Sequence, residues 1–285
     1  MKRKIQLFLE LMRFHRPTGT YLLLWPTLWA LWIAAAGHPT IKMIVIFVLG
    51  TIVMRAAGCV INDLFDHKFD AHVERTRLRP LANKQISKRA ALILFLILAS
   101  LGLGLVLQLN QYCLWLAIIA VLLTAFYPLC KRFFAVPQVI LGLTFNGVLF
   151  AFVAEQNHLP LLAWIVYATA FLWAMAYDTQ YAMTDQADDE VLGLKSSAIF
   201  FGKHVKLFIL IFQLLFLLGL IITGYLAKLN QFYWLSLILV AALISYQQKL
   251  LRRPGRNTGF NAFKSNNWLG LVIFIGIVLS YTLPN

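Results

Sequence analysis

Acidic side chains are scarce in this chain and are concentrated in two short segments. Only 11 Asp and Glu residues occur among the 285. Nine of these lie either between Asp63 and Glu74 or between Asp178 and Glu190. Crowded carboxylates repel one another unless a cation lies between them, and hard oxygen ligands of this kind suit Mg²⁺ bridging to a phosphate group. The two segments therefore predict a site for magnesium and phosphate.

The spacing within each segment places its polar residues on one face of a helix. At about 100° per residue, positions four or seven apart fall close together around the helix axis. The aligned residues are Asn62, Asp66 and Asp70 in the first segment and Asp178, Asp185 and Asp189 in the second. Each segment ends a long apolar run, so two helices are expected to bring two carboxylate faces to one mouth.

Basic residues lie close to the acidic segments and have the chemistry to bind phosphate oxygens. Arg75 and Arg79 follow the first acidic segment, and Lys131 and Arg132 lie between two later apolar runs. Arginine forks and lysine point charges suit phosphate oxygens. The simpler alternative is that these residues only set membrane orientation. Acid, metal and base together indicate a diphosphate site, and apolar surroundings favour an isoprenoid diphosphate as the substrate.

Composition places the chain among polytopic membrane proteins. Hydrophobic residues make up 61% of it and the mean hydropathy is +0.76, beyond the range of soluble domains. The net charge of +14 is dispersed between apolar runs without a basic stripe, which argues against nucleic-acid binding. Cys59, Cys113 and Cys130 form no CxxC pair, and we interpret them as small core residues.

Nine apolar runs predict nine transmembrane helices and an all-α fold. The runs cover residues 18–36, 41–64, 89–109, 111–129, 134–154, 159–183, 206–227, 231–248 and 266–283. At 1.5 Å per residue each can cross a hydrocarbon layer of about 30 Å. We interpret residues 1–285 as one domain in which helices 1–4 and 5–8 form a weak repeat and the ninth helix closes the bundle.

Lysine and arginine predict the orientation. With nine spans, 22 Lys and Arg residues fall on one side of the membrane and only Lys42 and Lys228 on the other. The positive-inside rule then places the N-terminus and both acidic segments in the cytoplasm and the C-terminus outside. Residues 1–17 combine helically spaced apolar residues with basic ones, so we expect an amphipathic surface segment and no signal peptide.

Arg55 is the one basic residue inside a membrane run, and a charge at such depth is a functional candidate. It shares a helix face with Asn62 and Asp66. We predict that Arg55 either binds a carboxylate of an acceptor and so orients that acceptor, or supports the acidic motif. The structural alternative is an ion pair with an acidic side chain.

Aromatic residues could stabilise a carbocation. The candidates are Trp25, Trp29, Phe145, Phe150, Trp173, Tyr177 and Tyr181.

Motifs along most of the chain resemble one family, the UbiA superfamily of intramembrane aromatic prenyltransferases. They are Arg16-Pro17-Thr18-Gly19, 24–32 (LWPTLWALW), 54–70 (MRAAGCVINDLFDHKFD), 127–131 (YPLCK), Pro137-Gln138-Val139, 177–185 (YDTQYAMTD), Gly193-Leu194-Lys195-Ser196 and 246–250 (YQQKL). The pairing of NDxxDxxxD with a later DxxxD is specific to the family. Residues 144–158 depart from the family pattern, in a wall of the expected cavity.

The resemblance implies nine helices around a central cavity with a cytoplasmic mouth, in the inner membrane of a bacterium. It implies Mg²⁺ as cofactor and transfer of a polyprenyl group from polyprenyl diphosphate to the ring carbon ortho to the hydroxyl of 4-hydroxybenzoate, in ubiquinone biosynthesis. Other acceptors, namely naphthoate, homogentisate or haem, are the first alternative. A secondary transporter is the second, although no Gly or Pro pair interrupts matching helices near the bilayer centre.

The resemblance also assigns roles to single residues. The implied metal ligands are Asn62, Asp66, Asp70, Asp185 and Asp189, of which the four carboxylates are also the catalytic candidates. The implied diphosphate ligands are Arg79 and Lys131, with Arg75 as an addition. Arg132 is a further diphosphate candidate because of its charge and its place beside Lys131. We expect Arg55, Tyr177 and Asp178 to bind the acceptor. Asp185 is the first candidate to accept the phenolic proton, with a role as metal ligand alone as the alternative.

Overall fold

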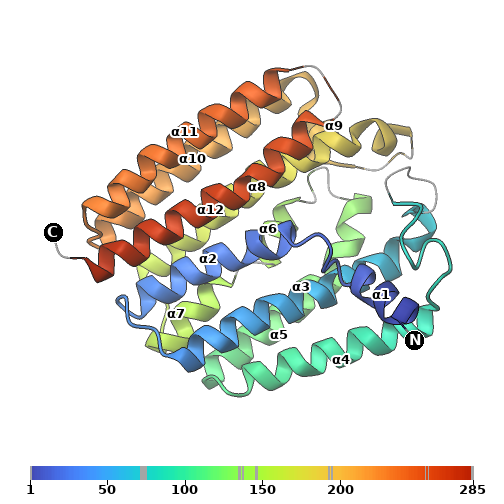
Figure 1. Cartoon of the computed structure of the whole chain (residues 1–285), viewed down its shortest axis with the longest axis horizontal. Coiled ribbons are helices and arrows are strands. Elements are labelled where there is room, and N and C mark those ends of the chain that lie inside the picture. Colours follow the sequence, from blue (N-terminus) through green and yellow to red (C-terminus); the bar gives the residue numbers. More distant parts are fainter. Residues whose placement is uncertain are drawn as a thin grey trace.

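A computed structural model shows a bundle of α-helices (Figure 1). It describes residues 2–70, 76–133, 136, 138–144, 147–191, 193, 195–253, 255 and 257–283, without the side chains at 2, 68–69, 123–133, 141 and 144. The helices are α1 (Lys2–Leu11), α2 (Thr18–Ala34), α3 (Ile41–Asp70), α4 (Lys88–Val106), α5 (Gln111–Phe133), α6 (Gln138–Thr144), α7 (Val148–Gln156), α8 (Leu161–Val191), α9 (Ser197–Phe201), the 3₁₀ turn η1 (Gly202–His204), α10 (Val205–Leu226), α11 (Gln231–Arg252) and α12 (Thr258–Thr282). The predicted all-α class is confirmed for this part of the chain.

Most predicted runs coincide with one helix each, but the run at 134–154 does not. It contains two shorter helices, α6 and α7. The start of α7 lies against α2, because a Cβ atom built on Gly147 would collide with the Thr27 side chain. A residue without a side chain is needed at this close approach. The expectation of one continuous fifth helix is therefore wrong for the described residues.

The main core lies where α2, α8, α10 and α12 pack together. Trp29 of α2 and Trp173 of α8 have ring centroids 5.1 Å apart, and Trp173 stacks on Phe216 of α10 at 5.8 Å. Both indole N–H groups donate to α12, from Trp29 to the Gly270 carbonyl at 3.1 Å and from Trp173 to Asn266 Oδ1 at 2.9 Å. These contacts hold α8, which carries the second acidic segment, against α12.

Six stretches of described helix are long and apolar enough to cross a membrane, so this is a multi-pass membrane protein. They are Ile41–His67, Lys88–Val106, Leu161–Val191, Ser197–Leu226, Gln231–Arg252 and Thr258–Thr282. Outward faces of these helices carry large apolar side chains, as expected of surfaces that contact lipid. Helix α1 and the end of α12 lie at opposite ends of the longest axis (Figure 1).

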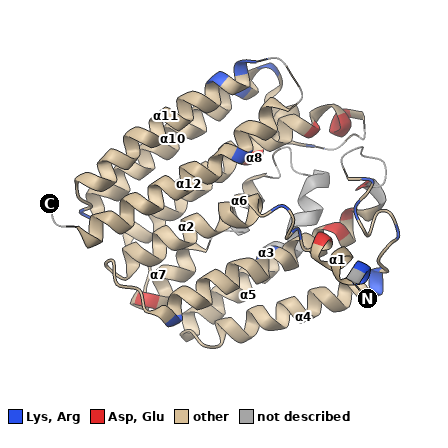
Figure 2. Ribbon diagram, viewed as in Figure 1, with Lys and Arg blue, Asp and Glu red and all other residues tan. Residues whose placement is uncertain are grey.

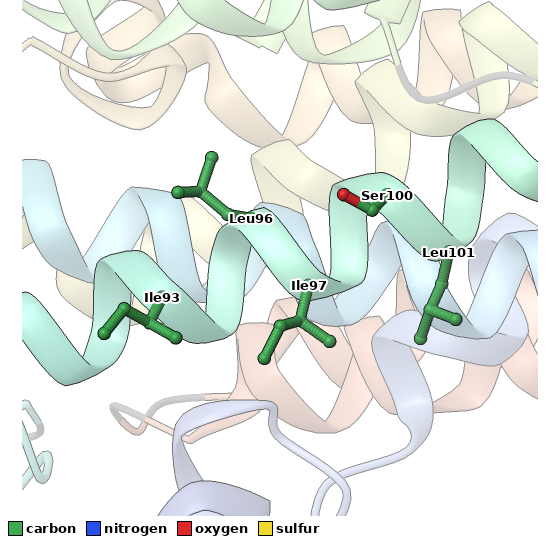
Figure 3. A pocket seen from close by; sticks show the side chains of 5 residues that line it. All are labelled: Ile93, Leu96, Ile97, Ser100 and Leu101. Carbon is green, nitrogen blue, oxygen red and sulfur yellow. The ribbon is translucent and has the colours of Figure 1, made fainter.

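A hollow of about 410 Å³ lies on α4 and is lined by Ile93, Leu96, Ile97, Ser100 and Leu101. All five come from this one helix, and Figure 3 shows their side chains projecting from it side by side. None carries a charge, and the four aliphatic side chains are about half exposed. The hollow is therefore a gap between side chains on a lipid-facing surface and is distinct from the predicted substrate cavity.

Candidate metal and diphosphate site

The two acidic segments lie at the same end of the bundle. Helix α3 continues without interruption to Asp70, and α8 continues to Val191, so both motifs are helical as their spacing predicted. Figure 2 shows acidic positions gathered at the end of α8 and near the end of α3, on the side of the molecule where α1 lies. Helix α2 packs against both α3 and α8. Within the described residues, no three His, Cys, Asp or Glu side chains already converge as a ligand set.

Asp70, the last residue of the first motif, is buried and paired with an arginine. Arg79 donates from Nη1 to Asp70 Oδ2 at 2.7 Å, and the Thr76 hydroxyl donates to the Asp70 carbonyl at 2.9 Å. Burial raises the pKa of the Asp70 carboxyl above its ordinary value, Arg79 opposes the shift, and Asp63 adds to it. The ionised form of Asp70 therefore needs a cationic partner.

Asp63 is a site residue that the pattern analysis left without a role. Its exposed fraction is 1%, and it contacts two arginines. Arg13 donates from Nη2 to both Asp63 oxygens at 2.8 Å, and Arg79 donates from Nη1 to Oδ1 at 3.1 Å. The signal that could have found it is the seven-residue spacing from Asp63 to Asp70, which places both carboxylates on one helix face.

The second motif lies on a half-buried part of α8. Asp178, Asp185, Asp188 and Asp189 are all partly exposed, whereas Gln180, on another face of the same helix, is fully buried. The helix is therefore rotated so that its aligned acids avoid the sealed core. This arrangement leaves these acidic residues partly exposed.

Arg55 projects from α3 into the region between α2 and α8. A Cβ atom on Gly19 would lie 2.5 Å from Arg55 Nη2, so the guanidinium rests against the backbone of α2. Among the described residues it has no ion-pair or hydrogen-bond partner. The Tyr177 phenol of α8 lies within electrostatic range of both Arg55 and Asp178. The structure thus brings these three predicted acceptor-binding residues to one region.

Three of the predicted phosphate ligands fall where the structure gives no side chains. Arg75 lies outside the described residues, as does Phe145 among the aromatic candidates. The backbone of Lys131 and Arg132 belongs to the last turn of α5, but their side chains are outside the described part. Only Arg79 of this group is placed, and it lies beside the first acidic motif.

Three aromatic candidates, Trp29, Trp173 and Tyr177, belong to the buried core. Trp29 and Trp173 are 2% and 1% exposed and bond to α12 through their N–H groups. Their rings are therefore committed to packing, which was the simpler interpretation of an aromatic residue in a membrane bundle. Cys59 and Cys113 are free and buried, as expected of core residues.

A buried polar network joins α8 to α10, α11 and α12. Asn266 donates to Gln180 Oε1 at 2.8 Å, Gln180 donates to Gln247 Oε1 at 2.9 Å, and Gln213 donates to the same Gln247 oxygen at 2.6 Å. All four side chains are at most 2% exposed. Apolar surroundings make such bonds costly to lose. The network therefore contributes to the rotation of α8 and hence to the direction of its carboxylates.

The chain belongs to the UbiA prenyltransferase family, whose model matches residues 23–279. It is 48% identical over 278 residues to a 4-hydroxybenzoate octaprenyltransferase of Aeromonas salmonicida, covering 97% of this chain and 96% of the relative. It is 45% identical over 282 residues to a protein of the same name from Coxiella burnetii, covering 99% and 98%. The membership that the motifs predicted is confirmed.

Solved structures of more distant proteins share the fold. A UbiA homologue from Aeropyrum pernix K1 superimposes with a TM-score of 0.79 at 22% identity, covering 90% of this chain and 97% of that one. A UbiA homologue from Archaeoglobus fulgidus, solved with GPP and Mg²⁺, gives a TM-score of 0.68 at 17% identity, covering 95% and 99%.

The acidic segments have the chemistry that a magnesium ion requires. Asn62, Asp66, Asp70, Asp185 and Asp189 offer only hard oxygen donors, at the ends of two helices on one side of the bundle. Asp63 fits this role poorly, because both of its oxygens already accept hydrogen bonds from arginine. We therefore regard Asn62, Asp66, Asp70, Asp185 and Asp189 as the candidate metal ligands and leave Asp63 out of the set.

Proposed function

We propose that this protein transfers a polyprenyl group from polyprenyl diphosphate to the ring carbon ortho to the hydroxyl of 4-hydroxybenzoate, releasing diphosphate, in ubiquinone biosynthesis. Membership of the family supports prenyl transfer as the reaction. Relatives that match nearly the whole chain at 45–48% identity are named 4-hydroxybenzoate octaprenyltransferases, which supports this acceptor.

The Arg55 guanidinium, which has no ion-pair or hydrogen-bond partner among the described side chains, is the observation that carries the choice of acceptor. A charged group inside a membrane protein is normally paired, yet the described side chains give Arg55 no ion pair, although Asp178 lies in the same region. A bound carboxylate would complete it with a charge-assisted hydrogen bond. Seven residues separate Arg55 from Asn62, about 10 Å along the helix, so an acceptor held there by its carboxylate points its phenol toward the acidic motifs.

The remaining site residues then have distinct roles. Arg79 and Lys131 bind the diphosphate, with Arg75 and Arg132 adding positive charge. Mg²⁺ held by Asn62, Asp66, Asp70, Asp185 and Asp189 would neutralise the charge that develops on the leaving diphosphate. Asp185 accepts the phenolic proton, which raises electron density at the ortho carbon. That carbon forms the new C–C bond as the allylic C–O bond breaks. Its proton then passes to the released diphosphate, which restores aromaticity, and the product phenolate takes its proton back from Asp185.

The membrane arrangement that accompanies this function has nine spans around a cavity, with the N-terminus and both acidic motifs on the cytoplasmic side of the inner membrane. Strong asymmetry of Lys and Arg supports the orientation.

A membrane assay with radiolabelled 4-hydroxybenzoate and a polyprenyl diphosphate tests the proposal. We expect a prenylated product that disappears with EDTA and returns with Mg²⁺. Competing naphthoate, homogentisate or haem should leave the yield unchanged. Product formation with one of these acceptors, and none with 4-hydroxybenzoate, would refute the assignment.

The variant Arg55→Gln tests the acceptor site separately. We expect the KM for 4-hydroxybenzoate to rise about 10- to 100-fold, the equivalent of about 1.5–3 kcal/mol for a charge-assisted bond. The KM for the neutral analogue 4-hydroxybenzamide should change little. Arg89→Gln, which removes an exposed arginine at the start of α4, is the matched control. Equal losses for both acceptors would contradict recognition of the carboxylate by Arg55.

A further inference from the structure

Asp63 lies between two arginines that come from different parts of the chain. Arg13 follows α1 and reaches both oxygens of Asp63 at 2.8 Å. The Arg13 backbone is in the left-handed region, with φ of 63°, and its Nη1 also donates to the Glu10 carbonyl at 3.1 Å. The Arg13 guanidinium is therefore held on two sides, and it fixes one side of the Asp63 carboxylate.

Arg79 approaches the same carboxylate from the loop before α4. Its Nη1 atom donates to Asp63 Oδ1 at 3.1 Å and to Asp70 Oδ2 at 2.7 Å. One nitrogen is thus shared between the buried carboxylate of Asp63 and a member of the first acidic motif. The shorter bond goes to Asp70, so in this structure Arg79 bonds to one oxygen of a candidate metal ligand.

We propose that Asp63 is a positioning residue for Arg79, which sets how easily a divalent cation displaces Arg79 from Asp70. The inference rests on the proposed diphosphate site and adds a residue to it. Metal and guanidinium compete for the same carboxylate oxygen of Asp70. Asp63 provides a second acceptor that keeps Arg79 in place when Asp70 turns to the metal, so that the guanidinium stays beside the diphosphate.

Two substitutions on this chain of contacts have opposite expected effects. Asp63→Asn removes the charge that competes for Arg79, so Arg79 binds Asp70 more firmly and the metal binds less well. Arg13→Gln leaves Asp63 with Arg79 as its one arginine partner among the described residues, which draws Arg79 away from Asp70 and helps the metal. We expect each shift in the Mg²⁺ Kd to be about tenfold, the equivalent of about 1.4 kcal/mol.

The test is calorimetric titration of the full chain in lipid nanodiscs with Mg²⁺ alone, in the absence of substrate. We compare Asp63→Asn, Arg79→Gln and the double variant. If Asp63 acts through Arg79, the double variant has the same Kd as Arg79→Gln, because nothing remains for Asp63 to position. Glu10→Gln, which removes an acid beside Arg13 whose side chain bonds to Gln6, is the matched control and should leave the Kd unchanged.

Several outcomes would overturn the inference. Asp63 would be a direct metal ligand if Asp63→Asn raised the Kd equally with and without Arg79. A Kd that Asp63→Asn leaves unchanged, or an absence of saturable Mg²⁺ binding by the native chain, would also refute it. If Asp63→Asn fails to fold, the decrease in Kd expected for Arg13→Gln decides the question. Failure of the proposed function appears instead as a missing prenylated product while this pattern of Kd values persists.

Discussion

Replacing Asn266 by alanine removes the side chain that joins α12 to α8 in the buried polar network. The Asn266 amide accepts from Trp173 Nε1 at 2.9 Å and donates to Gln180 Oε1 at 2.8 Å. Trp173, Gln180 and Asn266 are each at most 1% exposed, so water cannot replace the lost partner. Asn266→Ala therefore leaves one donor and one acceptor buried without a partner.

The size of the effect follows from these two orphaned groups. A buried polar group that loses its partner costs about 1–3 kcal/mol, or about 2–6 kcal/mol for the pair. Interhelical polar contacts in membrane proteins measure about 0.6 to 1.7 kcal/mol each, because the unfolded chain also finds partners in the membrane. For two contacts the membrane values add up to about 1.2–3.4 kcal/mol. This range overlaps the first one at about 2–3 kcal/mol, which is the loss of unfolding free energy we expect.

The assay is reversible unfolding by SDS in mixed micelles, followed by far-UV circular dichroism. Asn261→Ala is the matched control, since Asn261 is exposed on the same helix, and it should change the free energy of unfolding by less than about 0.5 kcal/mol. Gln180→Leu combined with Asn266→Ala should cost less than the two single variants together, because they share one bond. A loss for Asn266→Ala no larger than that of the control would refute the argument.

Three further predictions concern close packing and the acidic motif. Gly19→Ala should raise the KM for 4-hydroxybenzoate with little change in kcat, because the new methyl group displaces the Arg55 guanidinium; an unchanged KM would contradict this contact. Gly270→Ala should destabilise the protein by about 1–3 kcal/mol, because its new methyl group overpacks against tryptophan rings of the core. Gly104→Ala is the control, since nothing lies within 4 Å of a Cβ atom at Gly104. In the same unfolding assay it should be neutral or stabilising. Asp185→Asn should abolish turnover while Mg²⁺-dependent binding of diphosphate, followed by calorimetry, survives; loss of both would make Asp185 a metal ligand only.

The helices and the faces of both motifs could be predicted from the sequence because they depend on local periodicity. Apolar runs set where most helices lie, and α3 and α8 do continue through Asp70 and Val191. The spacing of Asp66 from Asp70 fixes their common face whatever the rest of the chain does. The position of Arg55 within the apolar part of α3 could be predicted as well, because Arg55 lies inside the apolar run at 41–64.

Contacts between distant segments required the tertiary structure, because no periodicity records which side chains meet. Arg79 was expected to bind diphosphate, and the fold also pairs it with Asp63 and Asp70. The sequence predicts Arg13 as part of a surface segment. In the fold the end of α1 lies beside α3, and Arg13 bonds to Asp63.

Within the described part of 134–154, the expectation of one continuous helix does not match the separate helices α6 and α7. Apolar content alone favours one span there, but α7 begins after Gly147, which lies against Thr27 of α2. Hydropathy along a chain determines which segments enter the bilayer, since that free energy depends on each segment's own side chains. Packing between helices decides which polar groups meet inside, since a buried polar group is stable only beside a partner that another part of the chain supplies.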